Sequence, residues 1–130
     1  MLGRTLSRVA LTTLIGASSF TLLACGSVPA TGDVASAKQA MELAIGCKTD
    51  DAVAASQRAS ASGGIGGGLG DVERVVILRE AGRSSQADAA RAAYLSKAGA
   101  GSAAELDKTT ADGVERIRAE RAKRTGKRNC

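Results

Sequence analysis

The sequence contains no histidine and no tryptophan, and its 130 residues include one phenylalanine, one tyrosine and one proline. Without an imidazole, neither a Ser–His nor a Cys–His nucleophile can be assembled. The absence of imidazole and of clustered thiols also argues against a zinc-type metal site. With so few aromatic rings, the chain lacks the stacking platforms that bind single-stranded nucleic acid. We therefore expect a protein that is not an enzyme, holds no cofactor or metal, and binds no nucleic acid.

The apolar and hydroxylic run of residues 9–23 contains no charged side chain. Arg4 and Arg8 precede this run, and no acidic residue accompanies them. A basic start followed by an apolar run is typical of an export signal. The run is shorter than the ~20 residues that a permanent membrane-spanning helix needs. We expect residues 1–24 to form a signal helix that is removed from the mature protein.

The uncharged run ends on the tetrapeptide Leu22-Leu23-Ala24-Cys25, which resembles the lipobox of bacterial lipoproteins. The resemblance implies transfer of diacylglycerol to the Cys25 thiol, cleavage between Ala24 and Cys25, and acylation of the new amine with a chain such as palmitate. Two or three acyl chains hold a protein on a membrane essentially permanently. The following residue is Gly26 rather than the aspartate that resembles an inner-membrane retention signal. The expected address in a Gram-negative host is the periplasmic face of the outer membrane, and a Gram-positive host would change it.

The mature chain would be small and rich in small residues. Removal of residues 1–24 leaves 106 residues and lowers the formal charge from +5 to +3. Large aliphatic side chains are few, so a core of this composition buries little area per residue. With Cys25 alkylated, Cys47 and Cys130 remain as a pair in an oxidising compartment. A bridge between them would stabilise the fold by about 4–5 kcal/mol through the denatured state. The alternative is that Cys130 stays free or pairs with another protein.

Apolar periodicity and glycine breaks predict an all-α fold, a small bundle of about five short helices within residues 33–130. Residues 25–32 are expected to be a flexible tether beyond the lipid. Residues 61–70 hold six glycines in eight positions and are expected to be a flexible linker. The predicted helices cover residues 33–45, 50–60, 71–81, 84–97 and 102–123.

A weak internal repeat relates two of the expected hairpins at an offset of 35 residues, over residues 34–99. Met41 then aligns with Val76, and Ala52 with Ala87. An apolar helix, a glycine-containing turn and an alanine-rich helix resemble a tetratricopeptide hairpin. The resemblance implies two stacked hairpins capped by the C-terminal helix. A plain small helical bundle is the alternative interpretation.

Two further patterns have chemical interpretations that we weigh against structural ones. The glycine run follows no hydrophobic strand and contains no Gly-Lys-Ser/Thr, so a linker is favoured over a phosphate-binding loop. The acid pairs at Asp50 with Asp51 and at Asp71 with Glu73 are expected in the first turns of helices, where negative charge suits the helix dipole.

The tail over residues 116–128 is strongly basic. Seven cations share this window with one acid, Glu120. Such a tail is either a solvated helix end or a surface that binds anionic lipid or peptidoglycan. The leading hypothesis is a non-enzymatic envelope lipoprotein that acts as a helical interaction or assembly module for an envelope protein partner. One alternative is a structural lipoprotein that binds the cell wall or an anionic membrane through its tail, and another is an entry-exclusion or immunity-type lipoprotein. The cations of the tail are Arg116, Arg118, Arg121, Lys123, Arg124, Lys127 and Arg128.

Overall fold

The computed structural model describes residues 29–130, and over these residues the chain folds into five α-helices without a strand. The predicted all-α bundle is therefore confirmed. The predicted signal helix, its cleavage site at Ala24 and the lipidation site at Cys25 lie outside the described residues. The elements are α1 (Pro29–Ile45), α2 (Thr49–Ala61), α3 (Gly64–Glu80), α4 (Ser84–Ala98), the short 3-10 helix η1 (Ala100–Ser102) and α5 (Ala103–Thr125).

Over the described residues, no helix combines the length and the apolar character that a membrane span requires.

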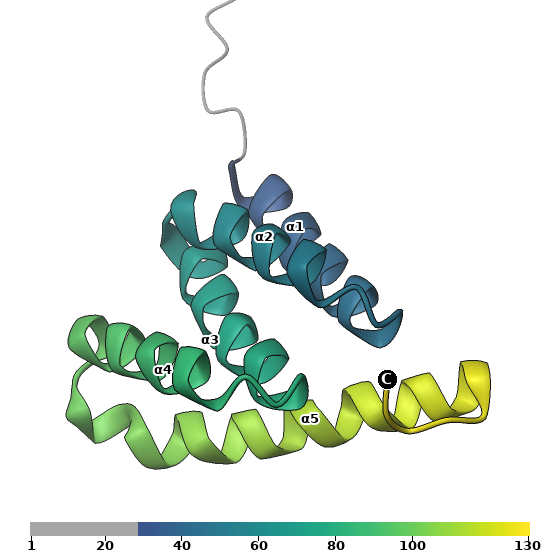
Figure 1. Ribbon diagram of the computed structural model, residues 1–130. Helices are drawn as coiled ribbons and strands as arrows, with labels where there is room; N and C mark the ends of the chain where they lie inside the picture. The colour runs from purple at the N-terminus through teal and green to yellow at the C-terminus, as the bar shows by residue number, and fades with distance from the viewer. Residues whose placement is uncertain (1–28) are drawn as a thin grey trace, which may run out of the picture.

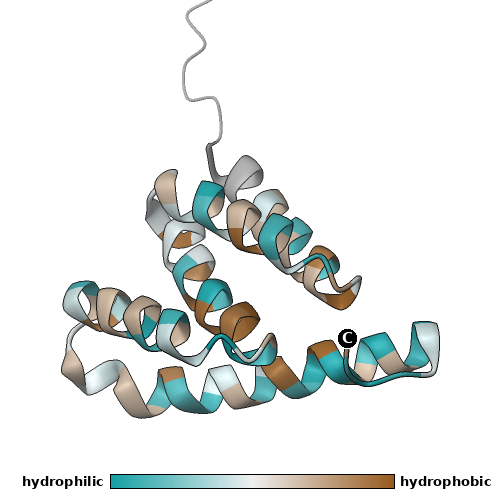
Figure 2. Ribbon diagram, in the orientation of Figure 1, coloured by the Kyte–Doolittle hydropathy of each residue, from teal (hydrophilic) through white to brown (hydrophobic). Residues whose placement is uncertain are grey.

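Helix α3 lies at the centre of the arrangement and packs against each of the other four α-helices (Figure 1). Four consecutive residues, Val75 to Leu78, are almost fully buried. Val76 and Ile77 pack toward α1, α2 and Ile117 of α5, whereas Val75 and Leu78 pack toward α4. Figure 2 shows the most hydrophobic residues gathered on α3 and on the nearby parts of α1 and α5. The rest of the core is largely alanine, in agreement with the thin core expected from composition.

The expected tether is shorter than predicted, because α1 begins at Pro29 rather than at residue 33. Proline suits the first turn of a helix, since its φ angle is already helical and its missing N–H has no partner to lose there. Residues 29–32 therefore belong to α1.

The two helical hairpins, α1–α2 and α3–α4, have the same type of turn, and the two turns are related by the 35-residue offset found in the sequence. In each turn, the second residue after the helix lies in the left-handed region, Cys47 at φ 63° after α1 and Gly82 at φ 72° after α3. The following N–H reaches back five residues, as in a Schellman motif. The paired hydrogen bonds are Gly46 N–H to Glu42 O (3.1 Å) and Ala81 to Ile77 (3.0 Å), Cys47 to Ala44 (3.1 Å) and Gly82 to Arg79 (3.1 Å), and Lys48 to Leu43 (2.9 Å) and Arg83 to Leu78 (2.9 Å).

The predicted flexible linker over residues 61–70 is wrong, because α3 already begins at Gly64. Gly67 and Gly70 face α2 and are buried there. A Cβ atom on Gly70 would lie 2.6 Å from the Ser56 carbonyl oxygen and 2.6 Å from the Ser60 nitrogen. The absence of side chains thus allows the two backbones to touch, and this packing outweighs the low helix propensity of glycine.

Candidate functional site

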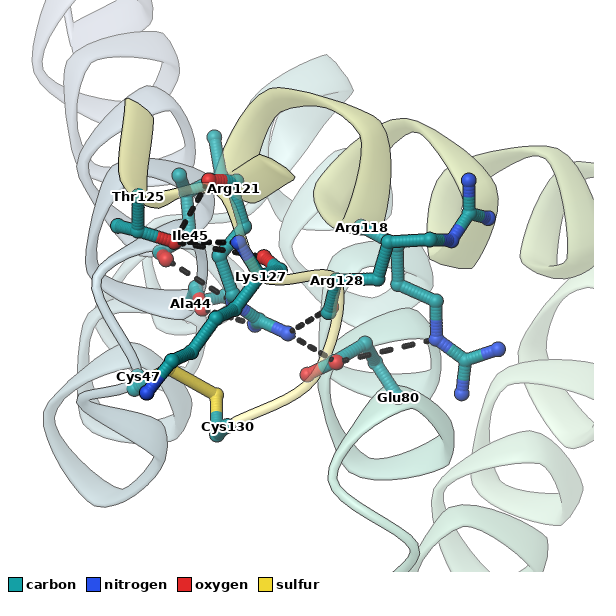
Figure 3. Close-up of a disulfide and its surroundings, with 10 residues drawn as sticks. All are labelled: Ala44, Ile45, Cys47, Glu80, Arg118, Arg121, Thr125, Lys127, Arg128 and Cys130. Atoms are coloured by element: carbon teal, nitrogen blue, oxygen red, sulfur yellow. Dashed lines mark hydrogen bonds and ion pairs between the residues drawn. A yellow bond between two sulfur atoms is a disulfide. The ribbon is translucent and has the colours of Figure 1, made fainter. Parts of the chain in front are cut away.

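The basic tail folds back on the bundle and is joined to it covalently. Helix α5 ends at Thr125, and Gly126 at φ 75° turns the chain back. The last residue, Cys130, forms a disulfide with Cys47, with the two Cα atoms 5.7 Å apart (Figure 3). This is the pairing favoured from the sequence. It fixes the C-terminal segment to the turn between α1 and α2.

Beside the disulfide, Arg121 is the largest fully buried side chain in the described part of the protein, with 1% of its surface exposed. Its Nε donates to the Ile45 carbonyl (3.1 Å), and its Nη2 donates to the Ala44 carbonyl (2.7 Å). Carbonyls in the last turn of a helix lack partners within the helix. Arg121 on α5 therefore caps the C-terminus of α1.

The third nitrogen of Arg121 binds two other parts of the chain. Nη1 donates to Glu80 Oε1 at the end of α3 (2.7 Å) and to the Arg128 carbonyl (2.9 Å). The Glu80 side chain is itself buried, and Arg118 approaches it with Nε at 4.0 Å (Figure 3). One guanidinium thus connects α1, α3 and the C-terminal segment. The prediction that Arg121 belongs to an anion-binding surface is wrong, because the group is inside the protein.

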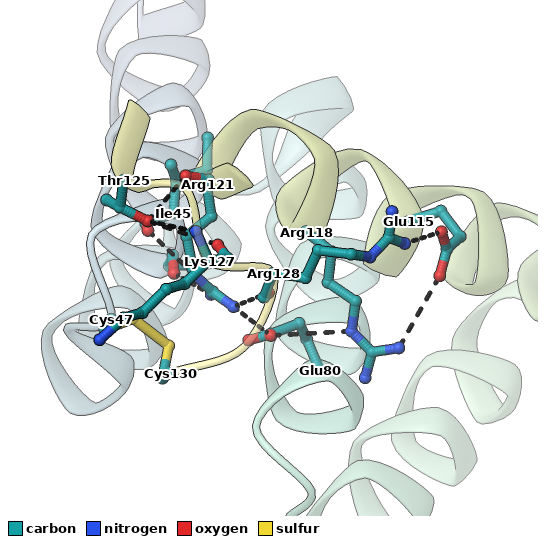
Figure 4. Close-up of polar contacts among 11 residues, drawn as sticks. Ile45, Cys47, Glu80, Glu115, Arg118, Arg121, Thr125, Lys127, Arg128 and Cys130 are labelled. Atoms are coloured by element: carbon teal, nitrogen blue, oxygen red, sulfur yellow. Dashed lines mark hydrogen bonds and ion pairs between the residues drawn. A yellow bond between two sulfur atoms is a disulfide. The ribbon is translucent and has the colours of Figure 1, made fainter. Parts of the chain in front are cut away.

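Most of the other tail cations pair with carboxylates of the same chain. Arg124 forms a two-pronged bond with Glu42 of α1 (2.7 and 3.3 Å), and this hydrogen bond holds the pKa of the Glu42 carboxyl below its ordinary value. Arg128 and Arg118 approach Glu115 at 2.6 and 3.7 Å (Figure 4). Lys123 pairs with Glu120 at 2.6 Å.

Two tail cations differ from the rest. Neither Arg116 nor Lys127 makes a side-chain ion pair within the described part of the chain. Of the proposed anion-binding tail, these are the members that the structure leaves without a carboxylate partner.

Arg116 lines a cleft of about 360 Å³ between α1, α3 and α5. The cleft has an apolar part and a charged part. The apolar residues are Met41, Ile45 and Ile117, and the charged residues are Lys38, Glu42, Glu73, Arg116, Glu120 and Arg124.

Glu73 is the unusual residue of this cleft. It is 8% exposed, and its Oε2 has no hydrogen-bond partner among the described residues. Burial raises the pKa of the Glu73 carboxyl to about 7, although the positive charge of Arg116 opposes the shift. The carboxyl therefore changes charge near neutral pH, and it can donate or accept a hydrogen bond there.

We expected the acid pair of Asp71 and Glu73 in the first turn of a helix. This prediction is wrong, because α3 already begins at Gly64. Asp71 is buried and accepts hydrogen bonds from Ser60, Arg74 (3.1 Å) and Lys97 (2.9 Å). Burial alone would raise the pKa of Asp71, but the bonds from Ser60 and Lys97 outweigh it and hold the pKa below its ordinary value. The sequence analysis named Glu73 only as an acid of a helix first turn and did not predict its burial in a cleft. Its only signal was its place beside the most apolar segment of the mature chain.

No group of three potential metal-ligating side chains is found among residues 29–130. No protein-family model matches the chain, and no curated protein or solved structure matches it either.

Proposed function

We propose that the protein is a lipid-anchored component of the bacterial cell envelope and that its helical domain is a non-enzymatic interaction module. The cleft between α1, α3 and α5 would receive the partner. One observation carries this proposal: a buried carboxyl group without a partner, Glu73, lines a cleft that also offers apolar surface. A buried polar group without a hydrogen bond costs free energy, and a bound partner can remove that cost.

The chemistry of the cleft suits a segment of another protein. Met41 and the exposed edge of Ile45 can contact an apolar side chain, whereas Ile117 is fully buried behind the cleft. Glu73 can bond to an amide or hydroxyl group. Lys38 and Arg116 lie on opposite walls, on α1 and α5, and make no ion pair within the described residues. They can receive an acidic side chain of the partner, which would also guide the encounter.

Site-specific photo-crosslinking in the producing cell tests the proposal. A photoreactive residue at Lys38, on the rim of the cleft, should give one discrete adduct. The same residue at Thr109, an exposed position of α5 outside the cleft, is the matched control and should not give that adduct. The substitution Arg116→Glu should weaken the adduct at Lys38, because it reverses the charge of the opposite wall. Identical adducts from the two positions, or none from Lys38, would count against the cleft.

The alternative, a tail that binds peptidoglycan or anionic lipid, has narrower support. Five of its seven cations are engaged within the protein, which leaves Arg116 and Lys127. Under this alternative, Arg116→Gln with Lys127→Gln should release the detergent-solubilised protein from isolated cell walls. Under our proposal, the variant and the wild type should cosediment equally little.

A further inference from the structure

Three large hydrophobic side chains are exposed in the described part of the protein, and all three lie near the start of α1 or α3. Ile65 is 92% exposed, Val34 51% and Leu69 40%. Figure 1 shows the first turns of these two helices at the same end of the molecule, which is also the end where residue 29 begins α1. The far end carries the turns at Cys47 and Gly82 and the disulfide.

Packing of α3 keeps the two apolar side chains of this helix on the surface. Ile65 and Leu69 are four residues apart and therefore share one face of the helix. The opposite face carries Gly67 and Gly70, which pack directly on the backbone of α2. The helix cannot turn to bury Ile65 without losing that close contact.

Two basic side chains, Arg58 and Lys97, lie at the ends of the helices next to this apolar end. Arg58 is exposed in the last turn of α2 and makes no ion pair with any described residue. Lys97, in the last turn of α4, lines a groove of about 340 Å³ together with Tyr94 and the glycines at the start of α3. The one acid of that groove, Asp71, is buried and already bonded to Lys97. An apolar tip with a basic border is the pattern of a surface that lies in an anionic membrane interface.

The position of the expected lipid selects the occupant. Four peptide units separate Cys25 from Pro29, so their Cα atoms can lie at most about 14 Å apart. A lipid on Cys25 would hold the start of α1 close to the bilayer and give this end of the domain a high local concentration at the membrane surface.

We propose that the domain docks on the bilayer through Ile65, Leu69 and Val34, with Arg58 and Lys97 against anionic headgroups. This inference rests on the proposed lipid anchor. It orients the molecule, so that the disulfide and the turns at Cys47 and Gly82 point away from the membrane.

The absence of tryptophan from the sequence makes the test direct. The substitution Ile65→Trp introduces a single reporter at the apolar tip, and Ser85→Trp introduces one at the start of α4, at the opposite end of the hairpin. Both sites are exposed, so both variants should fold, which circular dichroism checks. Each full-length chain is processed in a bacterial host, purified and reconstituted in vesicles of phosphatidylethanolamine and phosphatidylglycerol.

On these vesicles we expect the tryptophan of Ile65→Trp to emit at shorter wavelength and to be quenched several-fold by brominated lipid. The tryptophan of Ser85→Trp should show neither effect. If both variants float with the vesicles but neither reporter is quenched, docking is refuted and the lipid anchor stands. If neither variant floats, the anchor itself is refuted, and docking with it. A blue shift of the Ile65→Trp reporter that depends on protein concentration without vesicles would show that a second copy covers the tip, and would also overturn the inference.

Discussion

Arg121 shows how a single side chain can determine the position of a helix. Its guanidinium binds the end of α1, the end of α3 and the C-terminal segment. The bonds to α1 are buried, and the other two are partly buried. The Glu80 carboxylate is buried beside this guanidinium, so its negative charge depends on the positive charge of Arg121. A buried ion pair is costly to break from one side.

We expect Arg121→Met to destabilise the protein by about 3–5 kcal/mol, because it leaves the buried Glu80 with only the more distant Arg118 and the end of α1 without a cap. Arg128→Met is the matched control. It removes an exposed ion pair with Glu115, and it keeps the backbone carbonyl that Arg121 uses. The control should change the free energy of unfolding by less than about 1 kcal/mol. Urea unfolding measures both, and equal losses would show that Arg121 has no special role.

Glu73 makes a prediction about pH. The pKa of its carboxyl is about 7 in the folded protein and 4.5 as the ordinary value. Between these values the folded state binds more protons than the unfolded state, so stability falls as the pH rises from about 4.5 to about 7. Below this window the contribution of Glu73 is constant. The other titratable groups that line the same cleft are Lys38 and Glu42 from α1 and Arg116, Glu120 and Arg124 from α5, and of these Arg116 acts on the Glu73 carboxyl.

Replacement Glu73→Gln should remove this fall, which amounts to at most about 3 kcal/mol. The variant should therefore be more stable than the wild type above about pH 7. The control Glu115→Gln, at an exposed carboxyl, should keep the pH dependence of the wild type. Unfolding measured by circular dichroism across the window decides the matter. Parallel curves for wild type and Glu73→Gln would contradict the assigned burial.

At this scale the sequence predicted the disulfide partners but not the roles of the charged residues. Cys47 and Cys130 were the one pair left once Cys25 was assigned to the lipid. The seven tail cations, in contrast, look alike in the sequence. Whether an arginine is buried like Arg121 or lies at a cleft like Arg116 depends on which helix packs against α5, and local pattern does not contain that information.

Among the elements, α3 departs furthest from expectation. Its first seven residues contain five glycines, and intrinsic propensity places such a segment outside a helix. Contact with α2 reverses that preference, because only glycine allows the two backbones to approach so closely. The other helix boundaries were predictable to within a few residues, since Gly46, Gly82 and Gly99 mark the ends of helices in the sequence.

Two alanine substitutions separate these effects. Gly70→Ala should destabilise the protein by about 1–3 kcal/mol, because the new methyl group meets the α2 backbone. Gly68→Ala places the same methyl group where nothing lies within 4 Å, and it should stabilise α3 by about 0.5–1 kcal/mol. Thermal unfolding of the two variants provides the comparison. Stabilisation by both would mean that α3 does not pack closely on α2.

The turn between α1 and α2 contains a cysteine where its counterpart contains a glycine. Cys47 adopts φ 63°, a conformation that costs a non-glycine residue about 1–2 kcal/mol. We interpret this cost as a consequence of the disulfide, which requires a thiol at that position. The equivalent residue, Gly82, has no such constraint.

Comparison of Cys47→Gly with Cys47→Ser tests this interpretation, because both variants lack the bridge. Each should lose up to about 4–5 kcal/mol relative to the oxidised wild type. The glycine variant should retain about 1 kcal/mol more than the serine variant, since it relieves the turn. If the serine variant is as stable as the glycine variant in urea, the turn is not held in the left-handed conformation without the bridge.

In the whole molecule, the expected lipid lies at one end and a disulfide closes the other. The disulfide fixes α5 across α1 and α3, and the cleft forms where these three helices meet. The all-α class and the number of helices followed from periodicity and glycine breaks. The cleft did not, because it depends on how α5 packs across α1 and α3, where Arg121 and the disulfide join parts of the chain that are distant in sequence.

The lipid on Cys25 is the central claim, since the address, the oxidising compartment and the membrane-facing tip all depend on it. Intact-mass spectrometry of the protein purified from membranes, without reduction, tests this claim most directly. We predict a chain that begins at Cys25, carries a diacylglyceryl group and an amide-linked acyl chain, and gains the mass of two hydrogens on reduction. An unmodified Cys25, or a chain that still carries residues 1–24, would contradict it.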